Sequence, residues 1–301
     1  MAAQLTDSEN AVIAAATPRY SRCKIEIGPR LSPAGGVAIT GIDLSRPLPT
    51  AIRDRINAAF HTHHIVVFPQ QVLTREQQFA FGAQFGSVEP AAGRGHGSKR
   101  YGVAHIISNL DQDGKPVDRS ALPLSNYHWH TDKPYYRVPP MMTALYAVEL
   151  PPAGGDTEFA NTAMAYAALD GDTRRRIDGL RVVFYLGASA AGSACPSDAE
   201  SRAAVAHPLV RTHPETGVKA LYLGNHASHI LGQPLAEGRA LLKRLLAHAT
   251  RPEFRYLHRW RVGDLVIWDN RCLLHRAVAN FNLNQHRRIL HRTVVRGTVP
   301  V

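Results

Sequence analysis

Short apolar runs recur along the whole chain, each bounded by glycine, proline or aspartate, and they do not alternate regularly with helical segments. Runs of this kind are typical of β-strands. A doubly wound α/β sheet would require a helix after almost every strand, so the order predicts a mainly β fold, a sandwich or barrel with flanking helices. The expected strands are residues 36–42, 64–68, 142–150, 180–185, 220–223, 264–268 and 289–296.

Helical patterns lie between these runs in two places. Thr74 is followed three residues later by Gln77, as in a capping box, which predicts a helix over residues 74–85. Leucines at helical spacing predict another helix over residues 235–249. No boundary divides the chain, whose 301 residues can bury a substantial core. We therefore expect a flexible N-terminal tail over residues 1–21 and a single domain over residues 22–301.

The composition favours a soluble cytoplasmic protein. The three cysteines are far apart and form no C-x-x-C pair, which favours a reducing compartment. The N-terminal stretch lacks the basic region of a signal peptide, and no segment is long and apolar enough to cross a membrane. The net charge is +11, but the arginines are spread along the chain without a nucleic-acid-binding signature. We expect neither nucleic acid nor a membrane as a partner.

The segment NYHWHTDKPYY, residues 126–136, contains the triplet His130-Thr131-Asp132. On a β-strand, the first and third residues of a triplet point to the same face. Non-haem Fe(II) oxygenases bind their metal through two histidines and one carboxylate, which leaves positions open for other ligands. The triplet alone is weak evidence, because a chain with 16 histidines can contain it by chance. A half-buried histidine that is hydrogen-bonded to an aspartate is the competing interpretation.

A third ligand and an anion-binding group follow near the C-terminus. His275 comes after an expected strand, and Arg288 and Arg292 lie four residues apart in the last one. Residues four apart on a strand share a face. A guanidinium group binds a carboxylate through two parallel charge-assisted hydrogen bonds. The order therefore indicates a metal ligand followed by a carboxylate clamp.

Several ordered motifs carry a resemblance to a known family. From about Ile25 onward, the chain resembles the taurine/2,4-dichlorophenoxyacetate dioxygenase family of Fe(II)- and 2-oxoglutarate-dependent oxygenases. A block at residues 224–250, together with WDNRCLLHRA, is more similar to the 2,4-dichlorophenoxyacetate enzymes than to the taurine enzymes. The motifs are ITGIDLSRPL (39–48), HIVVFPQQ (64–71) with FG (85–86), HTD (130–132), PPAGGDTEF (151–159) and DLVIWDNRCLLHRA (264–277).

The resemblance implies a double-stranded β-helix (jelly-roll) core, a requirement for Fe(II), 2-oxoglutarate and O₂, and a homo-oligomer. It assigns the iron to His130, Asp132 and His275. It assigns the distal carboxylate of 2-oxoglutarate to Thr157 and Arg288, and it leaves Arg292 either the other carboxylate of the cosubstrate or an anionic substrate. Trp260 and Trp268 match family tryptophans near the metal, although a packing role explains them equally well.

The resemblance also suggests residues for the substrate. Asn126 matches a position that faces substrate in the taurine enzymes, and His226 and His229 would border the substrate chamber together with Arg292. Two departures from the family stand out. The segment SVEPAAGRGHG, residues 87–97, lacks the His/Tyr pair that binds the sulfonate of taurine. The loop after His275 is slightly longer than usual, which leaves Arg287 as an alternative to Arg288.

The expected activity is hydroxylation of a small anionic substrate, a carboxylate such as an aryloxyalkanoate, with release of succinate and CO₂. One alternative is the same chemistry on an alkyl sulfonate or sulfate. The other is a non-catalytic basic β-barrel that binds nucleic acid. The presence of His130, Asp132, His275 and Arg288 together argues against this last alternative, because a protein without iron has no evident use for all four.

Overall fold

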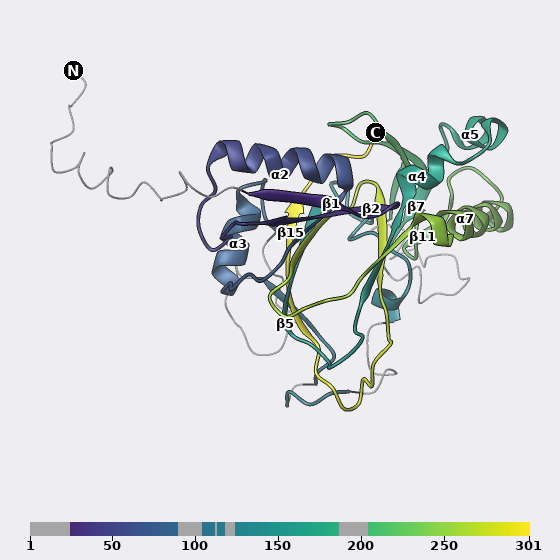
Figure 1. The fold of residues 1–301 in the computed structure, drawn as a ribbon. Helices are drawn as coiled ribbons and strands as arrows, with labels where there is room; N and C mark the ends of the chain where they lie inside the picture. The colour runs from purple at the N-terminus through teal and green to yellow at the C-terminus, as the bar shows by residue number, and fades with distance from the viewer. Residues whose placement is uncertain (1–24, 90–103, 112, 118–123, 187–203) are drawn as a thin grey trace, which may run out of the picture.

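The computed structural model describes residues 25–89, 104–111, 113–117, 124–186 and 204–301. The predicted N-terminal tail, Cys23, Cys195 and residues 90–97 of the segment 87–97 lie outside these ranges. The described chain has the jelly-roll core and flanking helices that the sequence predicts. Figure 1 shows the long strands β5 and β15 running side by side through the centre of the molecule.

The larger sheet has the order β1-β2-β3-β13-β5-β15-β4. Its neighbours pair antiparallel, apart from the parallel pair β2 and β3. Its central strand β13 is buried throughout and apolar up to Trp268, because both of its faces are covered by other elements. In chain order the strands are β1 (Glu26–Ser32), β2 (Gly35–Thr40), β3 (Ile65–Phe68), β4 (His105–Ser108), β5 (Pro140–Glu149), β13 (Leu265–Asp269) and β15 (Ile289–Arg296).

The smaller sheets complete the core. Phe159 and Leu273 on the β12-β6-β14 sheet pack against Val266 and Trp268 of the larger sheet, so these two sheets face each other. A β11-β7-β8 sheet and a β9-β10 pair extend the structure. The strands are β6 (Thr157–Asn161), β7 (Arg181–Phe184), β8 (Val205–Pro208), β9 (Val210–Thr212), β10 (Lys219–Leu221), β11 (Ala227–Ile230), β12 (Arg255–His258) and β14 (Leu273–Ala277).

Helices cover the outside of the core on two sides. Helices α2 and α3 pack against the outer face of the larger sheet, whereas α4, α5 and α7 gather on the other side of the molecule (Figure 1). The helices are α2 (Thr50–His63), α3 (Arg75–Ala83), α4 (Thr162–Ala167), α5 (Gly171–Ile177) and α7 (Leu235–Ala249), with 3₁₀ turns at η3 (Leu124–Tyr127) and η4 (Pro252–Phe254). None of the described helices is both long and apolar enough to cross a lipid bilayer.

The local sequence patterns predict much of this arrangement. Both expected helices are present, and the Thr74 hydroxyl and the Gln77 side chain form the predicted reciprocal capping box. All seven expected strands are found within a few residues of their predicted ends. The strand geometry assumed for the His130-Thr131-Asp132 triplet is not found, because His130 forms only an isolated bridge and Asp132 lies in a bend.

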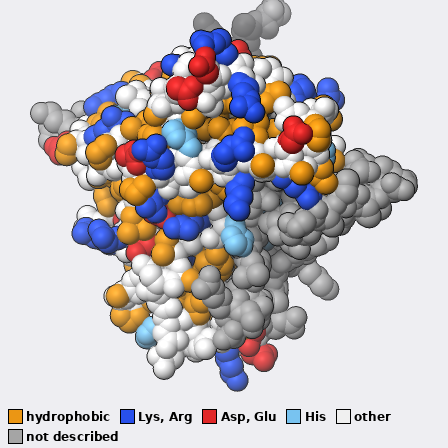
Figure 2. Space-filling view, turned by 90° about the vertical axis from the view of Figure 1, so that its right-hand side faces the viewer, with side chains coloured by type: hydrophobic (Ala, Val, Ile, Leu, Met, Phe, Trp, Pro, Cys, Tyr) orange, Lys and Arg blue, Asp and Glu red, His pale blue; other side chains and the backbone are white. Residues whose placement is uncertain are grey.

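The surface charge is mixed. Figure 2 shows one face of the molecule, on which Lys and Arg side chains are scattered among hydrophobic and acidic ones. On this face, the positive charge is not gathered into a single continuous patch. The charge on this face therefore gives no specific support to the nucleic-acid-binding alternative.

Candidate metal and cosubstrate site

Three buried side chains, His130, Asp132 and His275, place their potential ligand atoms within 4.8 Å of one another. Strand β14 carries His275. The backbone of His130 pairs with it, because the His130 N–H donates to the His275 carbonyl at 3.0 Å and the reverse bond is 2.7 Å. This backbone bridge, and not a strand through the triplet, brings His130 and Asp132 close to His275. Residues 145 positions apart in the sequence thereby meet at one point.

The protonation states of the three groups suit a divalent cation. The Nδ1 atom of His130 contacts the carbonyl oxygen of His128 at 2.8 Å, so it carries the proton and Nε2 has a lone pair to offer. Burial lowers the pKa of His130 and lowers that of His275 to about 3, which keeps both rings neutral. Burial alone would raise the pKa of Asp132, but the Arg292 charge and the hydrogen bond from Thr143 hold it well below its usual range.

The His275 ring has no competing partner at this site. Its Nε2 atom lies 3.9 Å from Asp132 Oδ2, too far for a hydrogen bond. Its buried Nδ1 atom has no hydrogen-bond partner among the described residues. Two neutral imidazoles and one carboxylate that lack mutual hydrogen bonds form the donor set of a 2-His-1-carboxylate iron site. The residues present therefore fit Fe(II).

A second buried group, His64, Asp269 and Cys272, also brings three potential ligand atoms within 4.8 Å. Here both carboxylate oxygens of Asp269 already accept hydrogen bonds, from Arg271 and from His213, each at 2.8 Å. Burial also raises the pKa of the Cys272 thiol well above its usual value, which leaves the sulfur protonated. This second group is therefore a structural ion network and not a cation site.

Arg288 is a buried cation that has no anionic partner in the part of the chain that the structure describes. Its Nε atom donates to the Gly155 carbonyl at 2.7 Å, and no carboxylate of the described residues lies within ion-pair distance of its guanidinium group. Burial lowers the pKa of Arg288 to about 10, so it stays charged at neutral pH. An unpaired buried charge is strongly unfavourable. Arg288 is thus prepared to bind an anion.

The neighbouring Arg287 points elsewhere. Its side chain is 44% exposed, forms an ion pair with Glu149 at 2.8 Å and donates to the Gly114 carbonyl at 2.9 Å. Arg288 precedes β15, and the pairing of β15 with β5 shifts register between Ile289 and Leu290. Arg288 and Arg292 nevertheless line the same pocket. Of the two adjacent arginines, Arg288 is therefore the one that lines the pocket.

One pocket is lined both by two of the predicted metal ligands, His130 and His275, and by Arg288. Thr157 lies in this pocket, and its hydroxyl oxygen accepts a hydrogen bond from the Trp260 indole at 3.0 Å. Because an indole can only donate, the hydroxyl proton of Thr157 points to another group. Trp260 does not line the pocket itself and contacts it only through its hydrogen bond to Thr157. The polar lining comprises Ser108, Asn109, Asn126, His130, Thr157, His275, Arg288 and Arg292, and the rest is largely apolar, with Ile107, Tyr127, Leu145, Trp268, Ala277 and Phe281.

The two candidate substrate histidines separate in the structure. The ring of His226 is buried, lies edge-on to His130 with centroids 6.5 Å apart, and contacts Tyr135 in the same manner. Burial lowers the pKa of His226 to about 4, so the ring is neutral. His229 is half-buried in β11, where its Nδ1 contacts Ser228 Oγ at 3.0 Å. The structure brings His226 to the site but not His229.

Two asparagines that the sequence analysis did not single out shape the clamp. Asn280 accepts a hydrogen bond from the Gly155 N–H and donates to the carboxylate of Asp156, both at 2.8 Å. Asn109 accepts from the Arg288 N–H at 2.8 Å and fixes the preceding loop through two backbone carbonyls. The sequence signal for this turn is the glycine pair of GGDT. Gly154 has a φ of +77°, a backbone conformation that glycine adopts readily.

Replacing Gly154 by alanine should weaken 2-oxoglutarate binding by about tenfold or more. A methyl group there would collide with the backbone of Asn280, which must move and take the Gly155 carbonyl with it. Gly179→Ala is a matched control, because Gly179 has the same φ of +77° but open space around it. Titration of both variants with 2-oxoglutarate tests the prediction. Equal affinity of the two variants for 2-oxoglutarate would show that the turn at Gly154 does not position Arg288 for binding.

Comparison with known proteins agrees with this geometry. The family model described as "Taurine catabolism dioxygenase TauD, TfdA family" matches residues 28–294. The chain is 38% identical to an alpha-ketoglutarate-dependent 2,4-dichlorophenoxyacetate dioxygenase of Cupriavidus pinatubonensis over 89% of this chain and 97% of that one. It is 34% identical to an (S)-phenoxypropionate/alpha-ketoglutarate dioxygenase of Sphingobium herbicidovorans, over 86% and 91% respectively. The crystal structure of AAD-2 with Mn(II) and N-oxalylglycine superimposes with a TM-score of 0.81 at 35% identity, covering 91% of this chain and 99% of that one.

Proposed function

The chain belongs to the taurine catabolism dioxygenase TauD, TfdA family, and we propose that its substrate is an aryloxyalkanoate or a closely related small carboxylate. The protein is a 2-oxoglutarate-dependent non-haem iron dioxygenase. Bound Fe(II) supplies the O₂ chemistry in which 2-oxoglutarate becomes succinate and CO₂ while one oxygen atom enters a C–H bond of the substrate. Where that carbon bears an ether oxygen, the hydroxylated product is a hemiacetal and breaks apart.

We assign roles to the residues of the pocket on this basis. His130, Asp132 and His275 hold the iron, and Arg288 with Thr157 binds the distal carboxylate of 2-oxoglutarate. The observation that carries the assignment is the buried Arg288, whose charge has no carboxylate partner among the described residues although it lies in the pocket that His130 and His275 line. A dicarboxylate that also reaches the metal would neutralise it.

The substrate class rests on a second cation beside an apolar wall. Arg292 lines the pocket, contacts Asp132 Oδ1 through one nitrogen at 3.3 Å, and has a buried Nε with no hydrogen-bond partner among the described residues. It therefore has donors left for a substrate carboxylate, and Asn126 can add another. The apolar wall, which includes Ile107 and Phe281, suits an aromatic or alkyl body. The pocket therefore offers complementary groups to both ends of an aryloxyalkanoate.

A substrate panel tests this proposal. The purified enzyme with Fe(II), 2-oxoglutarate and O₂ is given 2,4-dichlorophenoxyacetate, its neutral amide, taurine and an alkyl sulfate ester, and succinate is measured. We expect substrate-dependent succinate with the acid and at least about tenfold less with the amide, because the amide lacks the charge that Arg292 binds. A clear preference for taurine or the sulfate ester would transfer the assignment to those substrates.

His226 should contribute to turnover, whereas His229 should not. His226 packs against His130 and Tyr135, so His226→Ala should lower kcat/KM for the carboxylate several-fold without changing 2-oxoglutarate affinity. His229→Ala is the matched control and should behave like the wild type. A larger loss of kcat/KM in His229→Ala than in His226→Ala would show that His229, and not His226, faces the substrate.

A cytoplasmic location, a homo-oligomeric state and a single domain over residues 22–301 stay predictions from the sequence.

A further inference from the structure

Four side chains that lie next to the metal ligands form a continuous line of buried hydrogen bonds. Trp268 lies in β13, Asn270 begins the turn that follows its last residue, Thr143 lies on the adjacent strand β5, and Asp132 is one of the proposed iron ligands. All four are at least 96% buried. Hydrogen bonds in such a dry environment are strong, and breaking one leaves a polar atom without water to replace its partner.

The chemistry of the four groups fixes the direction of every bond. The Trp268 indole can only donate, and it donates to the Asn270 carbonyl oxygen at 3.1 Å. The amide NH₂ of Asn270 must then face Thr143, where it donates to Oγ1 at 2.9 Å. The Thr143 hydroxyl has a single proton, which it donates to Asp132 Oδ2. The direction therefore runs from the indole to the carboxylate and cannot be reversed.

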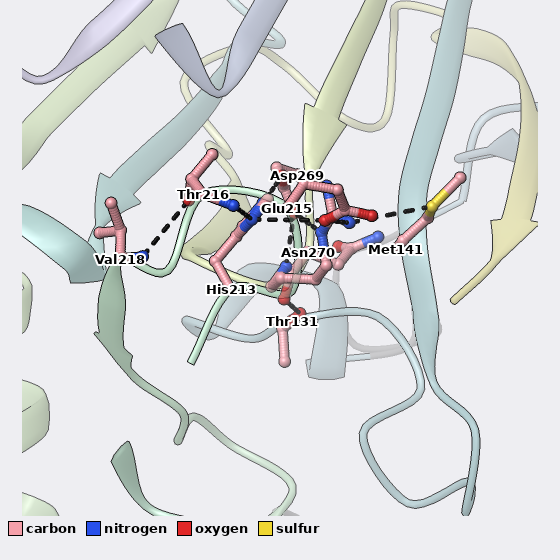
Figure 3. A network of polar contacts seen from close by, with 9 residues as sticks. Thr131, Met141, His213, Glu215, Thr216, Val218, Asp269 and Asn270 are labelled. Carbon is pink, nitrogen blue, oxygen red and sulfur yellow. Dashed lines mark hydrogen bonds and ion pairs between the residues drawn. The ribbon is translucent and has the colours of Figure 1, made fainter. Parts of the chain in front are cut away.

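A separate ion network holds the turn that carries Asn270. Figure 3 shows His213, Glu215 and Asp269 gathered beside Asn270, with Thr131 donating to the Asn270 backbone carbonyl at 2.8 Å. Asp269 binds both His213 and Arg271, and the Asn270 N–H donates to the Met141 carbonyl at 2.9 Å. These bonds leave the Asn270 side chain little freedom to turn away from Thr143.

We propose that Trp268, Asn270 and Thr143 are positioning residues that form a one-way hydrogen-bond relay, which fixes the orientation of the Asp132 carboxylate for metal binding. The same indole packs against the ring of His275, with centroids 4.7 Å apart, so one residue supports two of the three ligands. The inference rests on the assignment of the iron site in the proposed function. Outer groups that orient a ligating carboxylate commonly set metal affinity.

Thr143→Val tests the relay, because valine has the shape of threonine without the hydroxyl. We expect the dissociation constant for Co(II), measured anaerobically on the metal-free full-length protein, to rise about ten- to a hundredfold, and the visible absorption of bound Co(II) to change. Thr143→Ser keeps the hydroxyl and should restore both. Asn270→Asp replaces the amide donor by an acceptor, draws the Thr143 proton away from Asp132, and should also weaken binding.

Thr293→Val is the matched control for burial. Thr293 is 3% exposed and lies on the face of the same sheet that packs against α3, where its hydroxyl contacts Gln78. We expect this variant to bind Co(II) like the wild type, even where its thermal unfolding temperature falls. Should Thr143→Val not fold, Thr143→Ala in comparison with Thr143→Ser carries the same test.

The outcomes separate the relay from the site on which it rests. If Asp132→Ala binds Co(II) as tightly as the wild type, the iron-site assignment itself is wrong. If Asp132→Ala loses Co(II) but Thr143→Val keeps the wild-type affinity and spectrum, the assignment stands and the relay is overturned. Equal weakening in Thr143→Val and Thr293→Val would assign the effect to packing and would likewise overturn the relay.

Discussion

We expect Asp132→Asn to abolish turnover and to weaken Fe(II) binding by more than about a hundredfold, while the fold stays intact. Asparagine keeps the size and shape of aspartate but lacks the charge. The carboxylate, whose Oδ2 now accepts from Thr143 and whose Oδ1 accepts from Arg292, becomes a neutral amide group. A ligating carboxylate matters more than the outer groups around it, whose loss alone costs about ten- to a hundredfold. His130→Ala and His275→Ala should have the same effect.

The measurement combines metal binding with stability. Fe(II) affinity under anaerobic conditions, succinate release and the thermal unfolding temperature are compared between Asp132→Asn and the wild type. Asp172→Asn is the control, since Asp172 is exposed and pairs with Arg175 on the surface of α5. Full activity in Asp132→Asn would remove the metal assignment, and loss of activity together with unfolding would point to a structural role instead.

The sequence predicts those elements whose pattern is local. Helix α7 and strand β15 begin and end where leucine spacing and apolar alternation place them. Strands β6 and β14 were not identified. Thr157–Asn161 has little apolar character, and β14 follows so closely on β13 that the two share one motif. Their pairing is a contact between distant segments, which local propensity does not encode.

In the candidate site too, some residues could be predicted from the sequence and others could not. His130, Asp132, His275 and Arg288 could be found from motifs, because each is a residue type that the chemistry requires. The reason given for the triplet was wrong, since a backbone bridge to His275 and not a strand brings it into place. Thr143 gave no signal, because a buried threonine in a strand is common.

The sequence could not show whether Arg287 or Arg288 faces the pocket, because spacing does not distinguish two adjacent arginines. Burial decides between them. Arg287 ends in solvent beside Glu149, whereas Arg288 turns inward to the Gly155 carbonyl. An irregular pairing at the start of β15 determines which of the two arginines points into the pocket. The local sequence pattern does not predict such an irregularity.

Arg288→Lys should raise the KM for 2-oxoglutarate about ten- to a hundredfold and change kcat much less. A lysine ammonium is a point charge that cannot form two parallel bonds to a carboxylate, and the substitution also removes the Nε–H that now binds Gly155. Losing one charge-assisted hydrogen bond costs roughly 1.5–3 kcal/mol, which corresponds to that range. Initial rates of succinate formation at varied 2-oxoglutarate measure the effect.

Arg287→Lys is the control that the chain itself provides. It makes the same substitution one residue away, on an exposed side chain whose ion pair with Glu149 lysine can largely retain. We expect its KM for 2-oxoglutarate to match the wild type. A raised KM in Arg287→Lys together with an unchanged one in Arg288→Lys would move the clamp by one residue. The buried cation at Arg288 would then require another anion, because a guanidinium group buried in a pocket without a carboxylate partner is not stable unless something negative binds there.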